Sequence, residues 1–160
     1  MDHQPEISAF IRSWIYLRRM TIDFIEAVPI AYWDFSPSGK HGPLSKQFRH
    51  MVWVSDLYRC ALHDRKMDMA TKKKSYGGST DKAILVAALK ERDVKLVEML
   101  RDPKYSSNDY TVDFFGTPMT FSEFTHVMTQ HEALHHGMWS IYAAQAGFET
   151  PQSWKDDWEL

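Results

Sequence analysis

The chain has 160 residues, of which 44% are hydrophobic, and its 19 basic and 21 acidic residues give a formal net charge of −2. This is the balance of a globular protein with a core, and the length predicts a single domain over residues 1–160. The charge gives no reason to expect a nucleic-acid partner, and no apolar stretch approaches the roughly 20 residues that a membrane span requires.

Cysteine content and the N-terminal residues suggest a compartment. Cys60 is the only cysteine, which excludes an intrachain disulfide and a Cys-x-x-Cys metal site. The first residues lack a basic region followed by an apolar run, so we expect no secretory signal and a cytoplasmic protein.

Two helices are predicted in the first half of the chain. The first extends from about Pro5 to Val28, because its apolar side chains recur at helical spacing. The second begins near Pro43 or Leu44 and continues to about His63. The connection over residues 68–79 contains three consecutive lysines, 72–74, which we expect to be solvated.

Two further helices are predicted in the second half. The third covers about Thr80 to Leu100, with one buried stripe and with residues 79–81 available as caps. A small hairpin is expected before the fourth helix, with its strand near Tyr110–Phe114 and its turn at residues 116–118. The fourth helix begins with the capping box Thr120–Glu123 and extends to about Ala146.

The sum of these elements indicates an all-α protein. Four helices of about 20 residues with little strand between them predict a four-helix bundle. Its connections are longer than an up-and-down bundle needs, so one of them has the length to cross the bundle. The tail over residues 151–160 is polar apart from Trp154 and Trp158, and no element is predicted there.

Histidines on apolar stripes are the most informative feature. His131 and His135 lie one turn apart, only about 40° apart in helical projection, so both imidazoles can reach one ion. His50 shares the apolar stripe of the second helix and is the best third ligand. The competing interpretation, three core histidines, requires each buried ring to satisfy both a donor and an acceptor. The other histidines either project about 140° away from His131 or lie near ends and loops.

The stretch His131-Glu132-Ala133-Leu134-His135 also matches the His-Glu-x-x-His signature of zinc metallopeptidases, in which Glu132 would be the base. No third histidine follows at the spacing of the extended motif. Glu132 projects about 100° from His131, so an interhelical or solvated carboxylate is the simpler interpretation. Peptidase activity is therefore the weakest of the alternatives.

The same residues resemble the DinB/YfiT-like superfamily of metal-binding four-helix proteins. The resemblance rests on His50 early in the second helix and on the His131/His135 pair in the last one. It extends over the whole chain in layout. His136 and Met138 replace the Arg and Gln of the usual His-x-x-x-His-Arg-Gly-Gln pattern. The three ligands are unaffected, and the two departures concern the hydrogen bonding around them.

Membership of that superfamily would imply a homodimeric bundle that holds zinc, nickel or another divalent ion on His50, His131 and His135. Some relatives transfer small thiols. We therefore expect a metal-dependent transferase or hydrolase acting on a small-molecule thiol or electrophile, by thiol S-transfer or hydrolysis. A non-catalytic metal-binding helical dimer is the alternative, since three neutral ligands fit either role.

Overall fold

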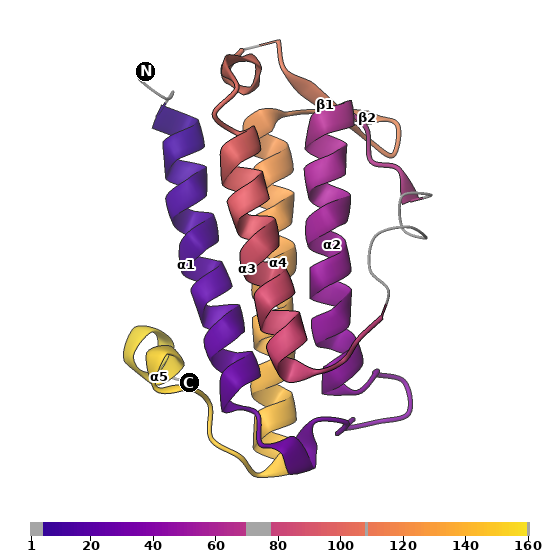
Figure 1. The fold of residues 1–160 in the computed structure, drawn as a ribbon, viewed down its shortest axis with the longest axis vertical. Helices are drawn as coiled ribbons and strands as arrows, with labels where there is room; N and C mark the ends of the chain where they lie inside the picture. Colours follow the sequence, from indigo (N-terminus) through magenta and orange to yellow (C-terminus); the bar gives the residue numbers. More distant parts are fainter. Residues whose placement is uncertain (1–4, 70–77, 108, 160) are drawn as a thin grey trace.

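The computed structural model describes residues 5–69, 78–107 and 109–159. Its four long helices are α1 (Pro5–Ala27), α2 (Leu44–Asp64), α3 (Lys82–Met99) and α4 (Phe121–Ala146). They lie side by side as a bundle, which confirms the all-α prediction (Figure 1). None of the described helices is long and apolar enough to cross a membrane.

The bundle does not have a simple up-and-down order. Helix α1 packs beside α3 and α4, and α2 packs beside the same two helices, so α1 and α2 occupy opposite corners. Helices α1 and α4 run in one direction, and α2 and α3 run in the other (Figure 1). The connection from α1 to α2, which includes the 3-10 turn η1 (Ile30–Tyr32), therefore crosses one end of the bundle. The lysines 72–74, which we expect to be solvated, lie outside the described residues.

Local capping residues determine where several helices begin and end. Of the three residues available before α3, Asp81 is the cap, and its carboxylate accepts a hydrogen bond from the Ile84 amide. Thr120 and Glu123 form the predicted capping box at the start of α4. Gly147 ends α4 with φ 81°, a left-handed conformation that suits glycine.

A two-stranded hairpin caps one end of the bundle. Strands β1 (Thr111–Phe114) and β2 (Thr117–Thr120) pair antiparallel, with another 3-10 turn, η3 (Pro103–Ser106), before them. The predicted turn is wrong by one residue, because Phe115 and Gly116 make it, both with positive φ. The Met67 amide donates to the Asp113 carbonyl at 2.8 Å, which ties the hairpin to the residues after α2.

The polar tail contains a helix that periodicity did not predict. Helix α5 (Gln152–Trp158) lies against the end of α1 (Figure 1). Trp154 is fully buried; its ring stacks on Phe24 at 4.8 Å and its indole N–H donates to the Met20 carbonyl. Tertiary burial of one tryptophan therefore stabilises a segment that is too short and polar to be helical alone.

Two apolar clusters fill the bundle, one toward each end. The cluster at the hairpin end takes its α1 residues from Ile7–Trp14, and the other takes them from Met20–Ile25. Between them lies a set of buried or nearly buried polar side chains from all four helices, here called the polar layer: Arg18, Ser55, Asp93 and Glu132. The three candidate histidines, on α2 and α4, lie near this polar layer along the bundle. The middle of the bundle is therefore chemically distinct from its ends.

Candidate metal centre

Three histidines from two helices meet in the middle of the bundle. His50 comes from α2, and His131 and His135 come from successive turns of α4. Each histidine offers one ring nitrogen, and these three nitrogens all lie within 4.8 Å of one another. Two of these nitrogens, His50 Nε2 and His131 Nε2, are separated by 3.4 Å.

This spacing fits a shared ion. Two nitrogens bound tetrahedrally to zinc, each at about 2.0–2.1 Å, are separated by roughly 3.3–3.4 Å. His131 Nδ1 is buried without a hydrogen-bond partner among the described residues, so no hydrogen bond at that atom fixes the tautomer of this ring. Its Nε2, the atom that faces His50, is free to be the ligand. The donor set is therefore consistent with a divalent metal.

The histidines are also held in the protonation state that metals require. Burial lowers the pKa of His131. Burial, and then the neighbouring His131, His50 and His136, lowers the pKa of His135 to about 3. Both rings are consequently neutral at pH 7, so a metal ion does not have to displace a proton from either.

Aromatic side chains surround the cluster. Trp53 packs on His50 with ring centroids 5.3 Å apart, Tyr58 on His131 at 5.9 Å, and Trp139 on His135 at 5.7 Å. Burial, together with the Glu132 carboxylate, raises the pKa of Tyr58, so its hydroxyl stays protonated. These rings limit water around the imidazoles and thereby strengthen electrostatic interactions at the site.

Comparison with known protein families agrees with the four-helix fold and the clustered histidines. A family model described as the DinB superfamily matches residues 14–139, a stretch that contains all three histidines. The chain belongs to the DinB superfamily. Among curated proteins, none shows a significant match to this sequence.

Solved DinB-like structures share the architecture. The chain is similar to a DinB-like protein from Bacillus subtilis, with 17% identity, a TM-score of 0.72, and coverage of 89% of this chain and 95% of that one. It is also similar to a DinB-like protein from Bacillus cereus, with 22% identity, a TM-score of 0.71, and coverage of 90% and 95%. At these identities the likeness concerns the fold.

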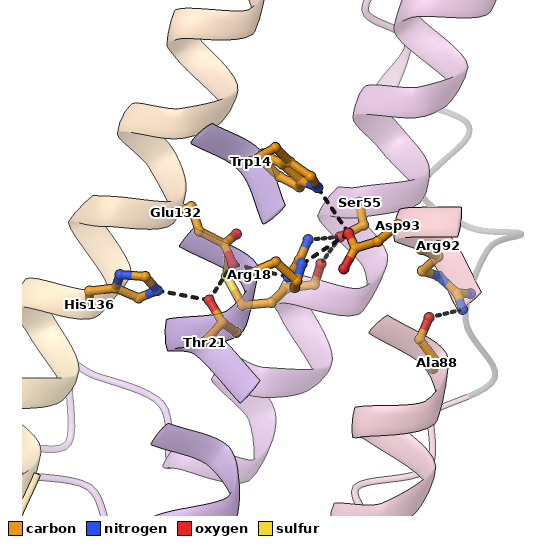
Figure 2. A network of polar contacts seen from close by, with 10 residues as sticks. Trp14, Arg18, Thr21, Ser55, Ala88, Arg92, Asp93, Glu132 and His136 are labelled. Atoms are coloured by element: carbon orange, nitrogen blue, oxygen red, sulfur yellow. Dashed lines mark hydrogen bonds and ion pairs between the residues drawn. The ribbon is translucent and has the colours of Figure 1, made fainter. Parts of the chain in front are cut away.

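Within this DinB fold, the Glu of the His-Glu-x-x-His stretch does not face the histidine cluster. Glu132 is 2% exposed and extends from α4 toward α1, where Arg18 Nη1 lies 3.0 Å from its Oε1 (Figure 2). The Thr21 hydroxyl donates to the same oxygen. Of the two simple interpretations, an interhelical or a solvated carboxylate, Glu132 is therefore the interhelical one. It is not placed to act as a peptidase base at the cluster.

His136 also belongs to the α1 side of α4. Its Nε2 lies 2.7 Å from the Thr21 hydroxyl oxygen (Figure 2). Its ring packs on Trp154, with ring centroids 5.1 Å apart. Since that hydroxyl donates to Glu132, it accepts from His136, which must carry its proton on Nε2. Burial, with the Arg18 charge, lowers the pKa of His136 to about 4.

The remaining histidines lie apart from the cluster. His41, His63 and His126 are exposed, and His3 is outside the described residues. Sequence reasoning missed Gln47, a buried side chain one turn before His50 on α2. Its Oε1 lies 3.3 Å from His135 Nδ1. The available signal was its spacing, because residues three apart on a helix share a face.

Proposed function

We propose that this protein binds one divalent metal ion, zinc or nickel, through His50, His131 and His135. The supporting observation is the convergence of three imidazoles from α2 and α4, with two Nε2 atoms 3.4 Å apart. Imidazole nitrogens suit zinc, nickel, copper and iron alike, so the donor set favours this class of ion over magnesium or calcium.

We further propose that the site acts on a small molecule, by thiol S-transfer or by hydrolysis. The described residues offer three protein ligands, and catalytic zinc sites use three with one position left for substrate or water. Bound there, a divalent ion supplies Lewis acidity and keeps a thiol or water ionised near neutral pH. The chain itself contributes neutral imidazoles and aromatic walls that limit solvent.

A non-catalytic role remains the alternative, and a specific observation favours it. The cluster contains side chains of both α2 and α4, and it lies where the polar layer separates the two apolar clusters. An ion bound to these histidines would hold the two helices together. Leu134 and Ile141, two turns apart on α4, are 62% and 55% exposed. A second copy of the chain covering this face would form the proposed homodimer.

Metal content is the first test. Untagged protein purified without chelator is analysed by plasma mass spectrometry beside a His131→Ala/His135→Ala variant and a His126→Ala control. His126 is an exposed histidine on the same helix. We expect near-stoichiometric zinc or nickel in the parent and the control, and little in the double variant. A parent that stays free of metal after incubation with both ions contradicts the proposal.

Activity and association then separate the two roles. The metal-loaded protein is screened against small thiols paired with electrophiles, and against esters and amides. A turnover that disappears in the double variant supports the enzyme. An inert protein that loses stability, or dissociates from a dimer in light scattering, when its metal is removed supports the structural alternative.

A further inference from the structure

Gln47 connects the histidine cluster to the C-terminal half of α4. It lies on α2, is 8% exposed, and its amide reaches three groups on α4: His135, Trp139 and Tyr142. The Gly42 carbonyl, just before α2, is a fourth neighbour. Each end of the amide therefore has two defined neighbours.

Two of these neighbours can play only one hydrogen-bonding role, and they determine which way the amide points. The Trp139 indole N–H only donates, and it lies 3.1 Å from Gln47 Oε1, so the oxygen must be on that side. The Gly42 carbonyl only accepts, and it lies 3.3 Å from Gln47 Nε2.

The Tyr142 hydroxyl agrees with this orientation. It donates to the Gly42 carbonyl at 2.8 Å, so its oxygen is left to accept from Gln47 Nε2, which lies 2.5 Å away. Reversing the amide would set its nitrogen against the indole N–H and its oxygen against a carbonyl. Both contacts would be repulsive, so the orientation is unique.

This orientation determines the tautomer of His135. Gln47 Oε1 can only accept, and His135 Nδ1 lies 3.3 Å from it, so Nδ1 must carry the hydrogen. A neutral imidazole has one such hydrogen, which leaves the lone pair on Nε2. We propose that Gln47 is a positioning residue that holds His135 as the Nδ1–H tautomer and so presents Nε2 as its metal-binding atom.

The consequence for metal binding rests on the proposed function, whereas the tautomer does not. Without an acceptor at Nδ1, His135 would distribute its proton between the two nitrogens and adopt other ring orientations. Partners that orient a ligating histidine typically contribute 10–100-fold to metal affinity. Gln47 fits this role with an uncharged acceptor that leaves the net charge of the site unchanged.

The test compares the parent with variants of Gln47, each metal-free and labelled with ¹⁵N at histidine. Long-range ¹H–¹⁵N spectra identify the tautomer of each histidine ring. We expect His135 to carry its proton on Nδ1 in the parent. Gln47→Met should remove this preference, whereas Gln47→Glu should retain it because a carboxylate also accepts from Nδ1. Gln145→Met, at an exposed glutamine on α4, is the matched control.

Zinc titration of the same proteins gives the second measurement. We expect about 10–100-fold weaker binding for Gln47→Met and parental affinity for Gln145→Met. An Nε2–H tautomer of His135 in the parent overturns the inference, as does a Gln47→Met protein that keeps both tautomer and affinity. If Gln47→Met does not fold, the parental spectrum alone still decides the tautomer. A parent that shows the Nδ1–H tautomer but binds no metal contradicts the proposed function and leaves the positioning of the ring intact.

Discussion

Arg18 on α1 and Glu132 on α4 form an ion pair in the middle of the bundle, with 3.0 Å between Nη1 and Oε1 and with both side chains almost completely buried. The same guanidinium binds Asp93 on α3 through Nε at 3.1 Å and donates to the Ser55 hydroxyl on α2 (Figure 2). One cation thus contacts the other three helices, and it does so between the two apolar clusters.

Removing that cation is expected to destabilise the fold. In Arg18→Met the carboxylates of Glu132 and Asp93 would remain buried without their partner, and we expect a loss of about 3–5 kcal/mol in the free energy of unfolding. Urea denaturation measures it. Arg12→Met, at an exposed arginine on the same helix, should change stability by less than about 0.5 kcal/mol. A loss below about 1 kcal/mol in Arg18→Met would mean that the polar layer is not held together by this charge.

His136 should make the stability of metal-free protein depend on pH. Its pKa is about 4 in the folded state and about 6.5 when unfolded, so the unfolded chain binds more protons between these values. The stability that neutral His136 contributes is therefore complete above pH 6.5 and falls as pH decreases toward 4.

The variant His136→Gln isolates this contribution. Between pH 7 and pH 4.5, we expect the stability difference between the parent and the variant to shift by about 2 kcal/mol against the parent. Urea denaturation at several pH values, with chelator present, measures the slope. His126→Gln replaces an exposed histidine and serves as control. A difference that does not vary with pH for His136→Gln would show that the ring titrates normally.

Metal binding should stabilise the folded protein through His50 as well as through α4. Zinc at one hundred times its dissociation constant is expected to add about 2.7 kcal/mol, because the ion binds the folded state preferentially. Thermal denaturation with zinc and then with chelator measures this gain and its reversal. His50→Ala should abolish most of the gain, and His63→Ala, an exposed histidine on the same helix, should keep it. Equal gains in both variants would place the ion elsewhere.

Trp154 should anchor helix α5. Its side chain is 0% exposed and stacks on Phe24, so Trp154→Ala is expected to cost about 3–5 kcal/mol. Trp158, in the same helix but 56% exposed, is the control, and Trp158→Ala should cost much less. Chemical denaturation compares the two variants, and similar losses in both would show that the docking of α5 does not depend on Trp154.

Local patterns were enough to locate the four long helices. The capping box at Thr120, the left-handed Gly147 and the 3.6-residue apolar spacing act over a few neighbouring residues, so they can be seen in the chain itself. The same period placed His131 and His135 on one face of α4. The apolar stripe of α2 indicated His50 as the nearest third imidazole, and the structure brings these three rings together.

The directions in which the helix faces point, and the formation of α5, depend on contacts between segments that are distant in the sequence. Helical spacing describes faces relative to one another, but the direction in which each face points depends on how neighbouring helices pack. Glu132 therefore faces Arg18, 114 positions earlier in the chain, and Gln47 faces His135, 88 positions later. Helix α5 forms because Trp154 fills a pocket made by α1 and α4. Such partners are set by the long-range packing of the bundle, and no short-range pattern in the chain encodes them.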